Sequence, residues 1–227
     1  PFDFAVKEGE TIGVIGGTGS GKSTFVSLIA RLYDVTSGRI LYRGVDEKEL
    51  KPEFIRGKIG FVPQKAHLFS GTIEENIRFG KPDATMDEII HAAKIAQAYD
   101  FIMEKPHQFQ EQIVEGATNV SGGQKQRLSI ARALIRKPEI YIYDDSFSAL
   151  DFKTDARLRK ALKPEIKNAI VFLVAQRVST ILDADKIVVL DEGKIAGIGT
   201  HRELLASCPI YYEIAASQLS KEELTYA

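Results

Sequence analysis

Short hydrophobic runs alternate with amphipathic stretches along most of the chain, and together they predict alternating strands and helices. The runs are rich in β-branched and aromatic residues, which favours parallel strands covered on both faces. The predicted strands are Thr11–Ile15, Arg39–Tyr42, Lys58–Val62, Ile140–Tyr143, Ala169–Val174, Lys186–Leu190 and Lys194–Ile198. Asp191-Glu192-Gly193 separates the last two strands, so we expect these to form a hairpin.

The middle of the chain, from about residue 72 to residue 136, shows no clear strand and predicts helices instead. Apolar residues recur at helical spacing over Asp87–Ala98, and a second helix is expected over Ser121–Arg136, before Pro138. We therefore expect an α/β core made of residues 1–71 and 137–227, interrupted by a helical subdomain over about 72–136.

The first predicted strand leads into a glycine-rich turn and then into a predicted helix over Ser23–Ala30. This context is the one that the phosphate-binding pattern G-x-x-x-x-G-K-[ST] requires. Glycines let consecutive backbone N–H groups point at phosphate oxygens, and the helix N-terminus adds partial positive charge. The segment, which predicts binding of a nucleoside triphosphate, consists of Gly16, Gly17, Thr18, Gly19, Ser20, Gly21, Lys22, Ser23 and Thr24.

Two side chains of this segment are suited to the phosphates and their metal ion. Lys22 can reach the β- and γ-phosphates, and the Ser23 hydroxyl can ligate Mg²⁺. The fold class expected from this combination is α/β, a P-loop NTPase with a RecA-like core, an inserted helical subdomain and a small antiparallel β portion. ATP and Mg²⁺ are the expected cofactors.

Composition and charge are those of a soluble module. The chain has 227 residues and a formal net charge of −1, which provides no electrostatic footprint for nucleic acid. No apolar run approaches the roughly 18 residues of a membrane helix. Cys208 is the only cysteine, so an internal disulfide and a zinc cluster are excluded and a reducing, cytosolic setting is expected.

A second glycine-containing anion site is predicted within the helical region. A hydroxyl, two glycines and a helix N-terminus stand together there. The segment closely resembles the signature, usually written LSGGQ, of ATP-binding-cassette (ABC) proteins. The resemblance implies that this site caps the γ-phosphate of ATP held by a second cassette. Its residues are Val120, Ser121, Gly122, Gly123 and Gln124.

Further motifs of the ABC family follow in the expected order, so the resemblance covers nearly the whole chain. Gln64, after Phe61-Val62-Pro63, resembles the Q-loop residue that touches Mg²⁺ and senses the γ-phosphate. Asp144 ends a hydrophobic strand, as a Walker B carboxylate does, and would hold Mg²⁺ indirectly. Asp151, in Ser148-Ala149-Leu150-Asp151, resembles the D-loop residue that crosses to the partner cassette.

The segment Leu68–Ile77 resembles the part of ABC exporters that follows the Q-loop. Glu115 matches the acidic position of the exporter X-loop, although most residues around it differ from that pattern. The resemblance implies a membrane domain as partner and a location at the cytoplasmic face of the cell membrane. We expect that domain, and the aromatic residue that stacks on adenine, to lie outside this chain, upstream of Pro1.

Two positions depart from the family pattern, and both are close to the chemistry. Asp145 stands where the family places a Glu that orients or deprotonates the attacking water. The shorter side chain retracts the carboxylate by roughly 1.5 Å, and a misplacement of about 1 Å can cost on the order of a hundredfold in rate. Gln176 stands where the switch His belongs, and an amide cannot carry the proton that an imidazole carries.

This combination resembles the subunit of bacterial heterodimeric ABC exporters that contributes the degenerate ATP site. The resemblance implies a non-identical partner cassette, a hydrolysis-impaired site in this chain, and an intact signature that completes the partner's competent site. Two alternatives are a non-transport ABC ATPase of the SMC or DNA-repair type and a regulatory nucleotide-binding module. The near-neutral charge and the exporter-like segment speak against the first of these.

Overall fold

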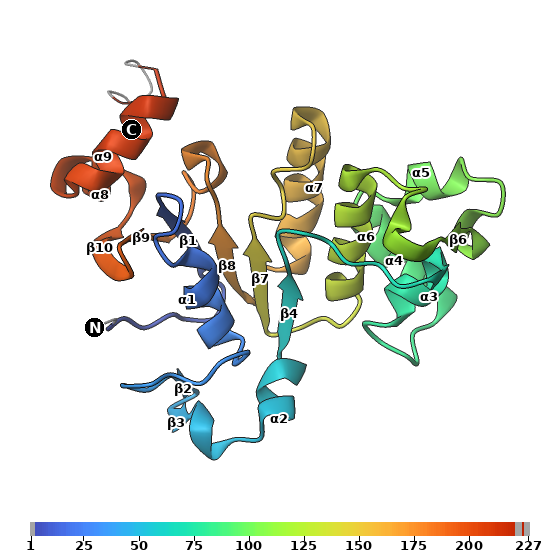
Figure 1. Ribbon diagram of the computed structural model, residues 1–227, viewed down its shortest axis with the longest axis horizontal. Coiled ribbons are helices and arrows are strands. Elements are labelled where there is room, and N and C mark those ends of the chain that lie inside the picture. Colours follow the sequence, from blue (N-terminus) through green and yellow to red (C-terminus); the bar gives the residue numbers. More distant parts are fainter. Residues whose placement is uncertain (1–2, 221–223, 225–227) are drawn as a thin grey trace. The chain divides into compact units, whose positions relative to one another are not determined.

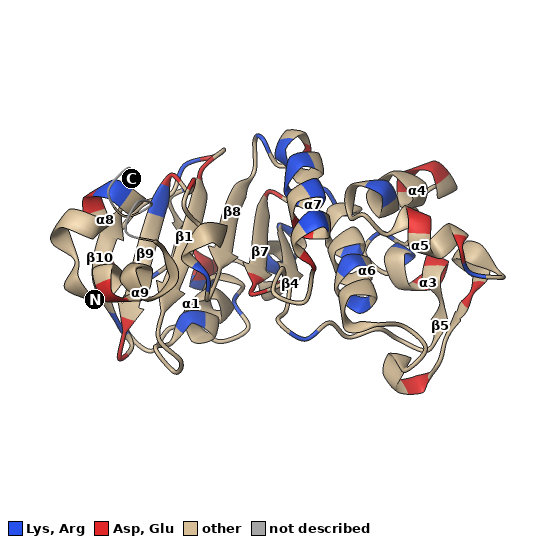
Figure 2. Ribbon diagram, turned by 90° about the horizontal axis from the view of Figure 1, so that it is seen from above, with Lys and Arg blue, Asp and Glu red and all other residues tan. Residues whose placement is uncertain are grey.

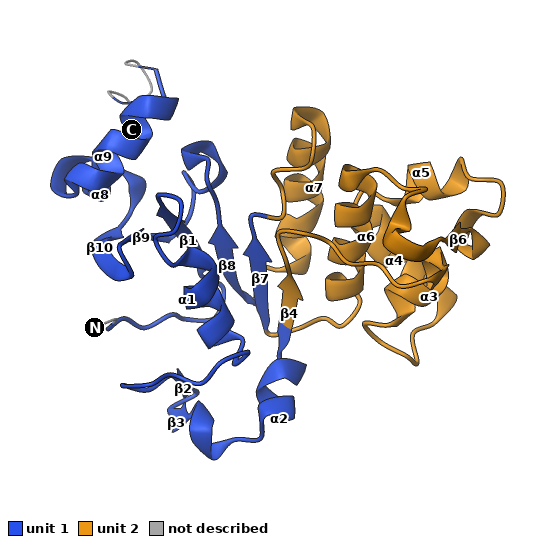
Figure 3. Ribbon diagram, in the orientation of Figure 1, with its two compact units in different colours: residues 1–59, 140–145, 168–227 blue, residues 60–139, 146–167 orange. Residues whose placement is uncertain are grey.

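The computed structural model describes residues 3–220 and 224 (Figure 1). The chain forms two compact units, each built from separate stretches of sequence (Figure 3). Unit 1 consists of residues 1–59, 140–145 and 168–227, and unit 2 of residues 60–139 and 146–167. The division at residues 72 and 136 into a core and a helical subdomain stays a prediction.

Unit 1 contains a largely parallel sheet in which five strands follow the order β10-β9-β1-β8-β7. β1 runs parallel to both of its neighbours, and Gly13 lies opposite Leu173 on β8 and Ile187 on β9. β10 is antiparallel to β9, which confirms the predicted hairpin. The strands are β1 (Thr11–Gly16), β7 (Ile140–Asp144), β8 (Ile170–Val174), β9 (Lys186–Asp191) and β10 (Lys194–Gly199).

Helices of unit 1 pack against this sheet. α1 (Lys22–Ile29) contacts β1, β7 and β8, while α8 (His201–Ser207) contacts β10 and α9 (Pro209–Gln218) contacts β9 (Figure 1). The four middle residues of β1 are buried, as its apolar run predicts, with Ile12 and Val14 completely inaccessible to solvent. The α/β P-loop fold class is thereby confirmed.

A small antiparallel ladder in unit 1 joins β2 (Leu41–Tyr42) and β3 (Val45–Asp46), and precedes the 3-10 helix η1 (Glu47–Glu49) and α2 (Pro52–Gly57). The strand predicted at Arg39–Tyr42 is therefore shorter than expected. The carbonyl of Ile40 accepts a hydrogen bond from the N–H of Glu47, which starts η1.

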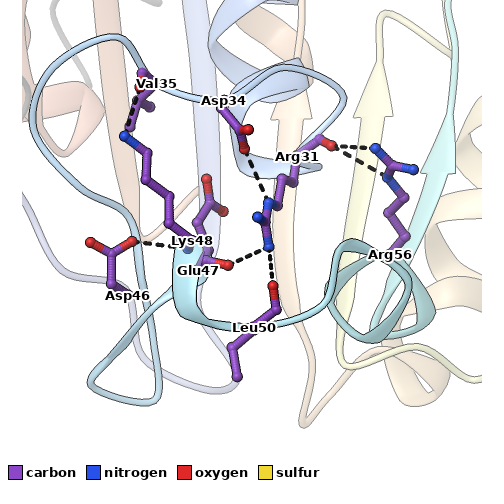
Figure 4. Close-up of polar contacts among 8 residues, drawn as sticks. All are labelled: Arg31, Asp34, Val35, Asp46, Glu47, Lys48, Leu50 and Arg56. Carbon is purple, nitrogen blue, oxygen red and sulfur yellow. Dashed lines mark hydrogen bonds and ion pairs between the residues drawn. The ribbon is translucent and has the colours of Figure 1, made fainter.

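A buried arginine braces this part of unit 1 (Figure 4). Arg31 donates hydrogen bonds to the carbonyls of Glu47 and Leu50, the latter at 2.5 Å, and its Nε lies 3.1 Å from Asp34 Oδ1. Arg56 in turn donates to the carbonyl of Arg31 at 2.9 Å. The Glu47 side chain is buried beside this guanidinium, and burial raises the pKa of its carboxyl to about 7, against the lowering effect of Arg31.

Unit 2 is mainly helical and is organised around α6. α3 and α4 both contact α6, and α7 contacts α4. α7 buries Leu158 and Leu162 and carries a series of Lys and Arg residues on its remaining surface (Figure 2). The elements are β4 (Ile59–Val62), which begins at the boundary with unit 1, β5 (Gly71–Thr72), α3 (Ile73–Arg78), α4 (Met86–Ile95), α5 (Tyr99–Met103), η2 (Gln108–Gln110), β6 (Gln112–Ile113), η3 (Glu115–Ala117), α6 (Gly122–Leu134) and α7 (Phe152–Glu165).

Unit 2 differs from the predicted pattern in two places. The helix expected over Asp87–Ala98 ends at Ile95, because Gln97 takes a left-handed backbone conformation and its amide bonds the carbonyls of Lys94 and Ile95. The short strands β5 and β6 pair antiparallel in a region where no strand is expected. Each strand has two residues, which are too few to show an alternation of apolar and polar side chains in the sequence.

Across the residues that the structure describes, none of the helices combines the length and the apolar character needed to cross a bilayer.

Candidate nucleotide-binding site

The glycine-rich turn lies between β1 and α1, where the sequence predicts it. Gly19 and Gly21 have positive φ angles of 77° and 100°, which favour glycine. A side chain at Gly17 or Gly19 would meet only open space, so the backbone here is accessible to a ligand. A side chain at Gly16 would instead come within 2.2 Å of the carbonyl of Leu190.

The Lys22 side chain is held in place by backbone carbonyls of the same glycine-rich turn. Its Nζ donates hydrogen bonds of 2.8 Å to the carbonyls of Gly16 and Gly17. Burial lowers the pKa of the ammonium, while the nearby carboxylates of Asp144 and Asp145 raise it. A positive charge is therefore placed at the mouth of the turn, beside two acidic side chains.

Ser23 and Asp144 lie together at the start of α1 and the end of β7. The Ser23 hydroxyl donates to Asp144 Oδ1 at 3.3 Å. Burial raises the pKa of the Asp144 carboxyl, and the bond from Ser23 and the charge of Lys22 oppose that shift. A hydroxyl and a carboxylate are the hard oxygen ligands that Mg²⁺ prefers.

These residues fit a nucleotide phosphate and its Mg²⁺ ion. The turn leaves its backbone open at Gly17 and Gly19, Lys22 supplies the charge, and Ser23 with Asp144 supplies oxygen donors. In addition, the buried hydroxyl of Ser20 lacks a hydrogen-bond partner among the described residues.

Asp145 and Gln176 also meet in unit 1. Gln176 Nε2 donates a hydrogen bond to Asp145 Oδ2 at 3.2 Å. Asp145 has a positive φ of 48°, directly after β7, and its N–H donates to the carbonyl of Val174 at the end of β8. The two residues that depart from the ABC pattern are thus in direct contact through their side chains.

The predicted signature residues form the N-terminus of α6 in unit 2. Ser121 is the N-cap: its hydroxyl accepts from the N–H of Gln124 at 3.2 Å, and Gln124 Oε1 accepts from the N–H of Ser121 at 3.0 Å. A side chain at Gly123 would come within 3.1 Å of the carbonyl of Ala149. The structure therefore brings the signature helix and the predicted D-loop together.

Two further predicted site residues, Asp151 and Gln64, lie in unit 2, one at the start of a helix and the other in an exposed loop. Asp151 caps α7 through the N–H of Thr154 at 2.9 Å, and the hydroxyl and N–H of Thr154 lower the pKa of its carboxyl. Gln64 is exposed, directly after Pro63.

The backbone before Gln64 is held by two buried side chains that are absent from the predicted site residues. Ser146 Oγ donates to the carbonyl of Val62 at 2.8 Å, and Gln126 Nε2 donates to the carbonyl of Pro63 at 3.1 Å. Gln126 belongs to α6, so the helix that carries the predicted signature is bonded to the backbone just before Gln64. In the sequence, the polar Gln126 on an otherwise buried helical face is the only signal of such a contact.

The β9–β10 hairpin supports the phosphate turn from the other side. The N–H of Gly193 donates to the carbonyl of Ser20 at 3.1 Å. The sequence predicts the hairpin, and the tertiary structure places its turn against the phosphate loop.

Comparisons with known proteins agree with this architecture. The family model described as ABC transporter matches residues 1–148. The chain is 48% identical over 220 residues to an uncharacterized ABC transporter ATP-binding protein of Mycobacterium tuberculosis, covering 96% of this chain and 38% of that protein. It is 48% identical over 200 residues to a putative multidrug export ATP-binding/permease protein of Bacillus subtilis, covering 88% and 34%.

A similar solved structure is that of a bacterial Atm1-family ABC exporter with ATP bound. Its TM-score is 0.90 at 37% sequence identity, covering 94% of this chain and 38% of the exporter chain. The chain therefore spans little more than a third of the length of these relatives.

Proposed function

Because this chain belongs to the ABC transporter family and is an ATP-binding domain, an ATPase coupled to transport, we propose that it drives an exporter together with a second, non-identical cassette. The likeness to an exporter structure and to proteins named for multidrug export supports the exporter assignment. The place of action in this proposal is the cytoplasmic face of the cell membrane.

The proposed ATP site of this chain consists of the phosphate turn, Lys22, Ser23 and Asp144. Lys22 is positioned to neutralise the β- and γ-phosphates, and Ser23 and Asp144 to hold Mg²⁺ directly and indirectly. Gln64 joins the Mg²⁺ ligands in this proposal. Bound Mg-ATP supplies the phosphoryl group whose transfer to water releases the free energy for transport.

The hydrogen bond between Gln176 and Asp145 is the observation that carries the proposal of slow hydrolysis. A general base must lie within hydrogen-bond reach of the attacking water. Asp145 is one methylene shorter than Glu, and the Gln176 amide already occupies one of its oxygens. Gln176 can hydrogen-bond a phosphate oxygen but cannot accept a proton as His does. The site is thus suited to holding ATP and poorly suited to cleaving it.

The signature of this chain is intact, and we assign it to the partner's ATP. Ser121 pre-forms the N-terminus of α6, which presents backbone N–H groups and a positive dipole end to an anion. Asp151 and the D-loop, adjacent to Gly123, would complete the same interface. An intact signature beside an impaired site is useful only if a different chain supplies the catalysis.

A pocket in unit 2 supports docking of a membrane domain. Its volume is about 150 Å³, and its lining includes Phe61, Pro63 and Arg132. Phe79 also lines the pocket, and the centroid of its exposed ring lies 4.7 Å from that of the exposed Phe69 ring, with the Arg132 guanidinium over both rings. Exposed aromatic side chains of this kind typically mark a protein interface. We propose that a cytoplasmic segment of the membrane domain covers them.

The test compares two variants in the assembled heterodimer. Asp145→Ala should reduce steady-state ATP turnover only modestly, since Asp145 is poorly placed as a general base. Removal of the partner's equivalent Glu should reduce turnover by about 10²–10⁴-fold. Equal collapse in both variants would contradict the asymmetric assignment, and the absence of hydrolysis at either site would favour a regulatory nucleotide-binding module.

A further inference from the structure

The last residue of α9 makes contact with the loop that carries Gln176. Gln218 Nε2 donates to the backbone carbonyl of Gln176 at 2.9 Å, and Gln218 Oε1 accepts from the backbone N–H of Val178 at 2.8 Å. One side-chain amide thus bonds two backbone groups that lie about 40 residues earlier in the chain.

This pair of bonds has the pattern of strand pairing. In a parallel pair of strands, one residue donates its N–H to the carbonyl of a residue opposite and accepts at its own carbonyl from the N–H of the second residue after that one. The Gln218 amide bonds residues 176 and 178 with the same spacing. β8 ends at Val174, and η4 (Val178–Thr180) begins at Val178. The amide therefore bonds the segment between the end of β8 and the start of η4, and it satisfies the first N–H group of η4.

The position of α9 is set by its own packing, independently of Gln218. Tyr211 and Ala215 are completely buried, and the Tyr211 hydroxyl lies 2.6 Å from His201 Nδ1. α9 also contacts β9 and η4. The Gln218 side chain is exposed, so it does not contribute to the packing of the hydrophobic core.

We infer that Gln218 is a positioning residue for the ATP site. By fixing the backbone on both sides of Arg177, it holds the Gln176 side chain against Asp145, 3.2 Å away. This inference rests on the proposed role of Gln176 as the group that meets the γ-phosphate. It also means that a displacement of α9 is transmitted to the phosphate-sensing loop.

The test uses the 227-residue chain and measures the affinities of Mg-ATP and Mg-ADP by calorimetry. Gln218→Ala removes both bonds, and Gln218→Met removes them while keeping the length of the side chain. We expect either variant to weaken ATP binding by about three- to tenfold, the scale of one or two hydrogen bonds, and to leave ADP binding unchanged. Ser217→Ala is the control, because Ser217 Oγ bonds only the carbonyl of Ile214 within α9 among the described contacts.

A double-mutant cycle separates the two levels of the proposal. If Gln218 acts through Gln176, combining Gln218→Met with Gln176→Ala should weaken ATP binding no further than Gln176→Ala alone. Hydrogen exchange at the Val178 amide should rise in both Gln218 variants. Equal losses for ATP and ADP, or a loss that simply adds to that of Gln176→Ala, would overturn the inference.

The controls also show which proposal fails. Unchanged ATP affinity in Gln176→Ala would remove the proposed role of Gln176. A loss in Gln176→Ala without one in Gln218→Ala and Gln218→Met would remove only the role of Gln218. If Gln218→Ala does not fold, the result for Gln218→Met decides.

Discussion

Lys22 Nζ bonds the carbonyls of both Gly16 and Gly17, so the charge expected to meet the phosphates is held in place by the loop that would cradle them. The ammonium does not need to be ordered when a ligand arrives. Burial lowers the pKa of this ammonium, and the carboxylates of Asp144 and Asp145 oppose that shift.

Replacing Lys22 should show how much its positive charge contributes to the affinity for Mg-ATP. Lys22→Ala removes a charge-assisted contact worth about 1.5–3 kcal/mol, so Mg-ATP affinity should fall by about ten- to a hundredfold. Calorimetry measures the change, with Lys163→Ala on the exposed surface of α7 as the control. Equal affinities in the two variants would show that ATP binds elsewhere.

The signature should act on the partner's ATP. In a mixture of this chain with the proposed Glu-containing partner, Ser121→Ala should reduce ATPase activity severely. Thr85→Ala is a matched control, because Thr85 and Glu88 form the same kind of capping box at α4. Both variants should lose a similar stability, about 0.5–2 kcal/mol. If Thr85→Ala reduces the mixed activity as much as Ser121→Ala, the effect is one of folding and the head-to-tail assignment is wrong.

The proposed impairment of hydrolysis should be reversible by substitution at two positions. Asp145→Glu together with Gln176→His restores the longer carboxylate and a side chain that can accept a proton, so hydrolysis at this site should rise. Nucleotide retention after rapid gel filtration should fall in parallel, since ATP is then consumed where it was held. Gln176→Glu is a control that changes the charge without supplying an imidazole. Unchanged turnover and retention in the double variant would place the cause of slow hydrolysis in other residues.

The buried carboxyl of Glu47 should make stability depend on pH. Its pKa is raised to about 7 in the folded chain from an ordinary value of 4.5, because burial outweighs the attraction of Arg31 and Lys48, and Asp34 and Asp46 add to the increase. The folded state therefore binds a proton more tightly than the unfolded state. The corresponding stability is complete below about pH 4.5 and is lost as the pH rises through 7.

Denaturant unfolding of Glu47→Gln tests this assignment. At pH 5 the variant should be about as stable as the parent chain, and at pH 8 it should be more stable by on the order of 1–3 kcal/mol, since each pKa unit corresponds to about 1.4 kcal/mol. Glu49→Gln, an exposed change in the same 3-10 turn, should show no such dependence. A stability difference that is equal at both pH values would contradict the assignment.

The strands around the phosphate loop could be predicted because each is a nearly continuous apolar run, and a strand covered on both faces requires one. Thr11–Gly16, Ile140–Asp144 and Ile170–Val174 lie within one residue of their expected bounds. The β5–β6 ladder could not be predicted, because each strand has two residues and the pairing partners are about 40 residues apart. For α7, with Leu158 and Leu162 as its buried residues, the apolar pattern was too sparse to define a helix.

The sequence by itself determined the phosphate turn, the signature and the Walker B strand, because their chemistry resides in consecutive residues whose local backbone conformation follows from glycine, capping and chain direction. Only the tertiary structure decided that Asp145 faces Gln176, that Gly193 supports Ser20, and that Gln218 bonds the loop beyond β8. These contacts join residues 31 to 173 positions apart. The first two exist because parallel strands bring their carboxyl ends to one edge of a sheet, and the third exists because α9 packs against β9 and η4. A local sequence pattern does not indicate which distant residues will be in contact in the folded chain.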